Sequence, residues 1–270
     1  MTLAERIRDA SVPEGKVAVF FLAQAGFVFK TPAGRTLAVD PYLTDSVQRT
    51  VGFKRMTPTV IEPEDLDVDL LIVTHEHGDH YDLDAVPAIA AHPRTITAGP
   101  PECAELWRSQ GLPAERFVTV RRRQDCDLQD FRFRTVFADH GDLSPNCMGL
   151  LLDFGGLRAY ITSDTAYNLR EIPEVVEARP EVVIPVVNGR YGNLDAVEAA
   201  QLADALGARL TIPCHFWMFL EHGAGPVEFL MAQPLFAPNT RPYVMAPGEG
   251  ILLPDASPVE CEPALGRMAS

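Results

Sequence analysis

Three histidines and two acidic residues fall within one stretch of six positions, His75-Glu76-His77-Gly78-Asp79-His80. The stretch directly follows the apolar run 69–74, which has the composition of a short buried strand. Imidazole and carboxylate groups are ligands that borderline divalent metals prefer, and a strand end can hold several of them at one edge of a sheet. Gly78 has no Cβ and permits a sharp turn, so the side chains on either side can converge. The segment therefore predicts a metal centre at a strand end.

Three further candidate ligands share one position in the pattern, just past the C-terminal end of a predicted strand. They are His140 after 131–138, Asp164 after 157–162 and His215 after 210–214. Strand ends of an α/β sheet lie along a common edge, so residues distant in sequence can meet there. The segment 75–80 supplies four ligands and needs partners to complete two coordination shells. We therefore expect a dinuclear site.

Taken singly, each of these residues has an ordinary structural explanation. A histidine after a strand is usually a partly buried side chain with satisfied hydrogen bonds, and Asp164 lies between a serine and a threonine, as in many turns. Their shared position, together with the segment 75–80, favours metal binding. Ligating imidazoles usually donate their other N–H to an oxygen, so Asp40 and either Asp139 or Asp142 are expected to accept such bonds. Plain loop carboxylates are nearly as good an explanation.

Several other polar residues have both a functional and a structural explanation. Arg190, Tyr191 and Asn193 lie on a glycine-rich stretch after a predicted strand and are expected to line a substrate pocket, although a simple turn explains them equally well. For His222 a surface role is favoured over one at the border of the site. The triplet Arg121 to Arg123 is interpreted as a solvated loop in preference to an anion-binding site.

Predicted strands and helices alternate along the chain without a linker-like tract or an internal repeat. The clearest helix is 195–206, where Asp195 and Glu198 form a capping box and a glycine ends the helix. This alternation predicts one α/β domain over residues 1–270. The segment 254–270 is rich in proline, alanine and glutamate and is expected to be loosely ordered.

Charge and cysteine usage restrict the partners and the compartment. The net charge of −14 opposes binding to a phosphate backbone, so nucleic acid is excluded as the expected partner. The N-terminus lacks the basic-then-apolar pattern of a secretory signal, and no apolar run has the length of a bilayer-spanning helix. Five scattered cysteines contain no CxxC pair. We expect a cytoplasmic protein with reduced thiols and a small-molecule substrate, with the oligomeric state open, a homo-oligomer included.

The order of these residues resembles that of a known family. His75-x-His77-x-Asp79-His80, followed by His140, Asp164 and His215, is similar to the signature of the metallo-β-lactamase superfamily of hydrolases, over about residues 17 to 250. Segments that resemble the L-ascorbate-6-phosphate lactonase-like branch are Phe21 to Gly26, Ser163 to Tyr167, Asn188 to Asn193 and Ile212 to His215. The resemblance implies a four-layer αββα sandwich (the metallo-β-lactamase fold) with the metals at one edge of the paired sheets.

The resemblance also implies a division of the ligands. One metal would be held by His75, His77 and His140, and the other by Asp79, His80 and His215, with Asp164 bridging. A donor set rich in histidine suits zinc, while the carboxylates also permit manganese or iron. The lactonases are longer and lack a clear match to residues 139–141, so the general hydrolase assignment carries over more safely than the sugar-phosphate substrate.

Two divalent ions about 3.5–4 Å apart can share a water and lower its pKa, which gives a metal-bridging hydroxide at pH 7. Asp79 is expected to orient that hydroxide, since one carboxylate oxygen can accept its hydrogen bond while the other binds metal. A metal acting as a Lewis acid would stabilise the attacked oxygen. The predicted function is therefore a metal-dependent hydrolase acting on a small ester or lactone, phosphorylated or not.

Other functions compete with this one. A phosphodiesterase acting on a small phosphodiester would want a basic pocket, which the net charge disfavours. A tRNA 3′-end endonuclease would want a basic arm, and a β-lactamase would want a signal peptide. A non-catalytic metal-binding protein on the same fold is the alternative from another class, and intact candidate ligands at all seven positions argue against it.

Overall fold

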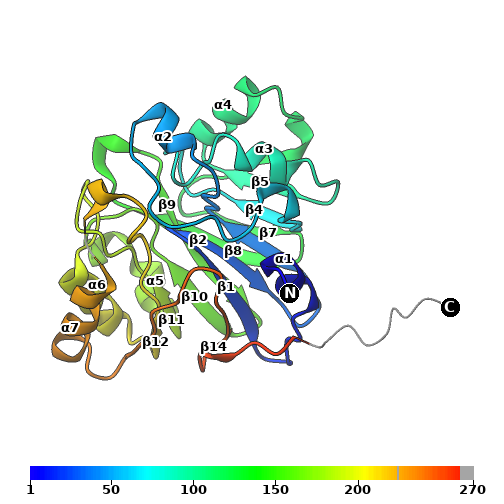
Figure 1. Cartoon of the computed structure of the whole chain (residues 1–270). Coiled ribbons are helices and arrows are strands. Elements are labelled where there is room, and N and C mark those ends of the chain that lie inside the picture. The colour runs from blue at the N-terminus through cyan, green and yellow to red at the C-terminus, as the bar shows by residue number, and fades with distance from the viewer. Residues whose placement is uncertain (224, 262–270) are drawn as a thin grey trace.

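The computed structural model describes residues 1–223 and 225–261, and its described strands form two sheets that pack face to face (Figure 1). The first sheet has eight strands in the order β15-β14-β1-β2-β3-β4-β5-β6. These strands are β1 (Val17–Ala23), β2 (Gly26–Lys30), β3 (Thr36–Val39), β4 (Leu70–Ile72), β5 (Ile96–Gly99), β6 (Phe117–Thr119), β14 (Gly250–Leu253) and β15 (Ser257–Pro258). Pairing is antiparallel from β15 to β3 and parallel from β3 to β6.

The second sheet has seven strands in the order β13-β12-β11-β10-β9-β8-β7. They are β7 (Asp125–Leu128), β8 (Phe131–Phe137), β9 (Met148–Phe154), β10 (Leu157–Ile161), β11 (Val182–Ile184), β12 (Leu210–Thr211) and β13 (Arg241–Pro242). The strands β7 to β10 pair antiparallel, and β10 to β13 pair parallel. Both sheets thus contain parallel strands whose C-terminal ends point to one edge.

Helices cover the outer faces of the sheets, with α3 and α4 on the side of β4 and β5 and with α6 and α7 on the opposite side of the molecule (Figure 1). The α-helices are α1 (Leu3–Asp9), α2 (Ser46–Thr50), α3 (Ala85–Ala90), α4 (Pro101–Ser109), α5 (Pro173–Ala178), α6 (Ala196–Leu206) and α7 (Pro226–Phe236). Short 3-10 helices occupy Pro63–Asp65, Ala114–Arg116, Gly141–Leu143, Leu169–Glu171 and Leu220–His222. None of the helices in the described part of the chain is both long and apolar enough to cross a membrane.

The strand β1 shows why its sequence is apolar at every position. Val19 and Phe21 join the core between the two sheets, whereas Phe20 and Leu22 join a second core beneath the helices. A strand covered on both faces reads as a continuous hydrophobic run, which the sequence has over 17–22. This layering confirms the predicted αββα sandwich.

Local sequence signals account for several element boundaries. The capping box of α6 is present, with the Asp195 carboxylate accepting from two backbone N–H groups and Gly207 closing the helix in the left-handed region at φ +67°. Of the tail expected to be loosely ordered, residues 254–261 include β15, which pairs with β14, and residues 262–270 lie outside the described part.

A buried ammonium group joins the first helix to the first sheet. Lys30 is 8% exposed, and its Nζ donates to the carbonyl oxygens of Ile7, Arg8 and Ala10 at 3.0, 2.6 and 3.0 Å. We expect Lys30→Met to lower the free energy of unfolding by roughly 1–3 kcal/mol, because these carbonyls lose a charged donor at the helix C-terminus. Urea denaturation measures the change. Lys54→Met, at an exposed loop position, is the control and should stay within about 0.5 kcal/mol; an equal loss in both variants would contradict this role for Lys30.

Candidate metal centre

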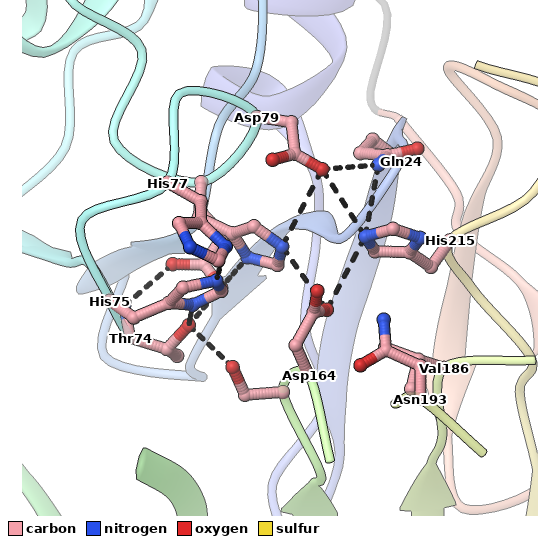
Figure 2. Close-up of polar contacts among 12 residues, drawn as sticks. Gln24, Thr74, His75, His77, Asp79, Asp164, Val186, Asn193 and His215 are labelled. Atoms are coloured by element: carbon pink, nitrogen blue, oxygen red, sulfur yellow. Dashed lines mark hydrogen bonds and ion pairs between the residues drawn. The ribbon is translucent and has the colours of Figure 1, made fainter. Parts of the chain in front are cut away.

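Four strand ends bring the predicted ligands to one edge of the two sheets. Figure 2 shows five of these residues, His75, His77, Asp79, Asp164 and His215, pointing toward one another. The loop after β4 carries the segment 75–80 from the first sheet. The second sheet supplies the other three residues, one each after β8, β10 and β12: His140, Asp164 and His215. The centre therefore lies across the junction of the two sheets.

All seven candidate ligands come close together in two groups. Within each group every residue offers a nitrogen or oxygen atom, and these atoms lie within 4.8 Å of one another. The first group is His75, His77, His140 and Asp164, and the second is Asp79, His80 and His215. Asp164 also reaches the second group, with its Oδ1 at 3.2 Å from His80 Nε2 and 3.3 Å from His215 Nε2. That place between the groups is the one expected of a bridging ligand, and the bridging role itself stays a prediction.

Several buried atoms at the centre lack hydrogen-bond partners in the described part of the chain. They are Nε2 of His80, both ring nitrogens of His140 and Oδ1 of Asp164. A buried polar atom without a partner costs free energy, and such atoms call for an explanation such as an ion. Five imidazoles and two carboxylates gathered here, some with unpartnered buried atoms, fit divalent cations.

The electrostatics of the centre suit metal binding at four of the candidate ligands and oppose it at His80. Burial lowers the pKa of His75 and His140, which leaves their imidazoles neutral near pH 7. Burial acts to raise the pKa of Asp79 and Asp164, but the neighbouring imidazoles of His80 and His215 hold both well below the usual range. Both carboxylates are therefore ionised at neutral pH. Burial acts to lower the pKa of His80, but the carboxylates of Asp164, Asp40 and Asp79 raise it well above its usual range, so this imidazole must release a proton when it binds a metal.

Asp40 orients one of the candidate ligands from behind. It is fully buried at the end of β3, and its Oδ2 accepts from His80 Nδ1 at 2.8 Å. The same carboxylate accepts from the backbone N–H and the hydroxyl of Thr74 at 2.8 and 2.6 Å. The hydrogen bond to a candidate ligand confirms the prediction for Asp40. It fixes the proton on Nδ1 of His80 and turns Nε2 toward the centre.

The corresponding prediction for His140 was wrong. The Asp139 carboxylate accepts from Asn168 at 3.3 Å, Asp142 is exposed, and neither bonds the His140 ring. The backbone turns away at this point, because the 3-10 helix 141–143 begins directly after His140.

The interpretation of Arg121 to Arg123 as a solvated loop was also wrong for the middle residue. Arg122 is half-buried, donates to the carbonyl oxygens of Cys147 and Ala138 at 2.7 and 2.6 Å, and lies over the Phe137 ring. It ties the end of β8 to the start of β9. The residue therefore supports the segment that positions His140.

Of two further residues at the centre, Gln24 was not singled out in the sequence and His222 was assigned to the surface. Gln24 lies in the tight turn between β1 and β2, where both it and Ala23 adopt positive φ angles of +54° and +76°. Its Nε2 donates to Asp79 Oδ2 at 2.7 Å and lies 3.0 Å from His215 Nε2 (Figure 2). The amide thus connects two residues of the second group.

His222 is the second of these residues, and the favoured surface role for it was wrong. The side chain is buried and stacks on the His215 ring, with ring centroids 4.8 Å apart and an interplanar angle of 10°. Its Nδ1 lies 3.3 Å from Gln24 Nε2. Burial lowers its pKa to about 4, so the imidazole is neutral at pH 7.

A cavity of about 210 Å³ opens over the centre. The candidate ligands His77, Asp79, His140, Asp164 and His215 line it, together with Gly78, Val47, Val51, Phe53, Leu143, Tyr191, Asn193 and His222. Of the three predicted substrate residues, Tyr191 and Asn193 are therefore at the cavity. Arg190 is not among its lining residues, and its guanidinium packs so closely on Gly223 that a Cβ there would overlap it.

A larger cavity, of about 650 Å³, lies against β7 to β10 and α5 and contains none of the candidate ligands. Its charged residues partly pair with one another, as Arg134 does with Asp125 at 2.9 Å. Size alone therefore does not identify the functional site in this molecule.

Comparison with known proteins gives consistent results. The model of a family described as a beta-lactamase superfamily domain matches residues 18–215. A UPF0173 metal-dependent hydrolase of Rubrobacter xylanophilus is 27% identical, over 87% of this chain and 96% of that protein. A protein of Escherichia coli named "Probable L-ascorbate-6-phosphate lactonase" is 22% identical, over 84% of this chain and 77% of its own. The structure of a metallo hydrolase from Ignicoccus hospitalis matches with a TM-score of 0.72 at 20% identity, covering 88% of this chain and 99% of that one.

Proposed function

Since the chain belongs to the metallo-β-lactamase superfamily and is one of its metal-dependent hydrolases, we propose that it uses a dinuclear centre to hydrolyse a small ester or lactone. The observation that carries the proposal is the meeting of seven nitrogen- and oxygen-bearing side chains from four strand ends, with unpartnered buried atoms among them. The cavity over these residues gives a small molecule access to them.

The two groups of residues suit two cations, which we propose to be zinc, with manganese or iron as alternatives. His75, His77 and His140 would hold one ion and Asp79, His80 and His215 the other, with Asp164 between them. When bound, such a pair supplies a water activated at neutral pH and a Lewis acid for the carbonyl oxygen.

Asp79 is the residue placed to handle the proton of the attacking water. Its carboxylate lines the cavity, and Gln24 fixes Oδ2 through a 2.7 Å hydrogen bond. No hydrogen bond from the described residues reaches Oδ1, so this oxygen can accept the water proton and later deliver it to the departing alkoxide. For a lactone that transfer completes ring opening, and for an ester it releases the alcohol.

The metal content of defined variants tests this proposal. We expect protein purified without chelator and supplied with zinc to contain about two equivalents by plasma mass spectrometry. His140→Ala should lose about one equivalent, because it removes a donor from the first group alone, and His215→Ala should lose the equivalent bound to the second. His92→Ala is the matched control, since that imidazole contacts the Glu64 carbonyl oxygen at 2.8 Å, outside both groups.

Hydrolysis is measured on the same preparations with a lactone, a thioester and a phosphodiester. We expect turnover of the lactone that disappears on chelation and returns with added metal. Full occupancy in both the His140 and His215 variants would overturn the dinuclear assignment. A loaded protein that turns over only the phosphodiester would replace the proposed reaction with phosphodiester cleavage.

A further inference from the structure

Above the candidate ligands, the cavity over the centre has a wall that is apolar and lacks lysine and arginine among the described residues. We infer that it takes an uncharged ester or lactone with a compact aryl or branched alkyl group, and that it rejects substrates carrying a phosphate on that group. The inference rests on the hydrolase function proposed above and narrows its substrate class.

The upper wall of the cavity is apolar and contains two aromatic rings. Val47 and Val51 come from α2 and its C-terminus, and Phe53 comes from the loop that follows. Leu143 comes from the 3-10 helix 141–143 and Tyr191 from a loop of the second sheet. The Phe53 ring lies 6.4 Å from the Tyr191 ring. Such a wall gains free energy by removing apolar surface of a ligand from water, and its rings favour a flat or branched apolar group.

Positive charge is missing from this wall among the residues that the structure describes, since none of the lining residues is lysine or arginine. Lys54, next to Phe53, and Arg190, next to Tyr191, are exposed and do not line the cavity. The two arginines near α2 have other partners. Arg55 donates to the carbonyl oxygens of Thr57 and Tyr42 at 2.7 and 3.0 Å, and Arg49 pairs with Asp84 at 2.7 Å. Phosphate recognition relies on charge-assisted hydrogen bonds, so a phosphate against this wall would lose hydration without a cation to compensate.

His222 adds one polar side chain to this wall. Its ring lies 6.0 Å from Phe53 and 5.5 Å from Tyr191, as part of the same aromatic cluster. Its Nδ1 lies 3.3 Å from the Gln24 amide nitrogen, so the imidazole is held on the side of the cavity where Gln24 meets the second group.

The size of the cavity limits the substrate further. Its volume of about 210 Å³ lies below the range of roughly 300–1,000 Å³ typical of sites for drug-sized ligands. A compact acyl or alcohol group fits this space, whereas a long chain would have to extend into solvent.

A matched pair of esters tests the inference on the metal-loaded protein: phenyl butyrate, and the same ester with a phosphate on the phenyl ring. We expect kcat/KM to favour the uncharged ester by about tenfold or more, the ratio that corresponds to roughly 1.4 kcal/mol. Equal or faster turnover of the phosphorylated ester would overturn the inference and leave the hydrolase function standing.

An added cation should change the preference. Val51 is 59% exposed at the rim of the cavity, so Val51→Arg should fold normally and offer a guanidinium to the phosphate. We expect it to shift the kcat/KM ratio at least tenfold toward the phosphorylated ester, whereas Val51→Gln, which is polar without charge, should not. An identical ratio in both variants would contradict the role assigned to charge at this wall.

Binding without turnover separates this inference from the proposed reaction. The ketone analogues of the two esters, benzyl propyl ketone and its ring phosphate, have a methylene in place of the ester oxygen; they cannot be hydrolysed and are titrated by calorimetry. Tighter binding of the uncharged ketone supports the inference even when neither ester reacts, an outcome that would overturn only the proposed function. Tighter binding of the phosphorylated ketone overturns the inference whatever the turnover.

Discussion

Asp79→Ala is expected to lower kcat/KM by roughly 10²–10⁴-fold, the usual contribution of a positioned acid–base group. The variant removes the carboxylate that lines the cavity and that the proposed mechanism uses to take the proton of the attacking water. It also removes one donor of the second group, so zinc content is measured beside initial rates. Asp79 lies in a loop, and the change should leave the circular dichroism spectrum and the unfolding midpoint near those of the unmodified protein.

Glu76→Gln is the matched control for this experiment. Glu76 lies in the same loop, outside both groups of candidate ligands, and its Oε2 accepts from the Ser144 hydroxyl at 2.8 Å. Glutamine keeps an acceptor for that hydroxyl while removing one negative charge, so we expect activity within a factor of about three. Near-normal turnover by Asp79→Ala would remove the mechanism proposed for this carboxylate.

Asp40→Asn is expected to weaken zinc binding by about 10–100-fold, the usual effect of losing the partner of a ligating imidazole. An asparagine that turns its oxygen to Thr74 presents an N–H to His80 Nδ1, and the imidazole proton is then driven to Nε2, the atom that faces the centre. Asparagine tolerates the backbone here, which has φ +45°. Competition with a chromogenic chelator measures the affinity.

Asp40→Ala should act on the fold as well. It leaves the Thr74 backbone N–H and hydroxyl without their buried acceptor, and we expect the free energy of unfolding to fall by about 3–5 kcal/mol. Asp69→Asn is the control, because that carboxylate is equally buried before β4 and accepts from Thr36 and Arg35. It should cost stability and leave zinc affinity unchanged; a parallel loss of affinity would show that burial, not contact with His80, explains the effect.

The candidate ligands were predictable because each follows a segment with a strand pattern, either a continuous apolar run, as in 69–74, or an alternation of apolar and charged residues, as in 131–138. The C-terminal ends of parallel strands share one edge of a sheet. The position of His215 directly after 210–214 therefore predicted that it lies near the residues that follow the other strands. The helix 195–206 was equally clear, since its capping box and terminal glycine are local signals that need no tertiary information.

The places of Gln24 and His222 at the centre could not be predicted from the strand pattern. Gln24 reaches the centre only because two successive residues adopt the left-handed region in the turn after β1, and neither is a glycine that would have signalled it. His222 lies on a 3-10 helix whose place depends on its packing against Phe219 and His215. Both positions result from contacts between segments far apart in the sequence.

The helix α7 shows a different limit of prediction from sequence, which concerns the pattern of its apolar residues. Val227, Leu230, Met231 and Leu235 are exposed on it, while Phe229 is fully buried. Apolar residues therefore surround the helix, and the periodic contrast between a buried and a solvated face, on which helix prediction depends, is absent. The interpretation of residues 121–123 as a solvated loop was wrong for a related reason. Three successive charges in a sequence do not reveal that Arg122 donates hydrogen bonds to two backbone carbonyl oxygens.

The strand ends hold the acids and imidazoles, whereas the wall above them comes from α2, the 3-10 helix 141–143 and the loop around Tyr191. Loops tolerate substitution and changes in length better than the strands of a packed sheet. Selection can therefore remodel what enters the cavity without disturbing the chemistry beneath it. In this architecture, substitutions at a few exposed loop positions can change substrate selectivity. Most members of a variant library confined to those positions should therefore keep hydrolytic activity.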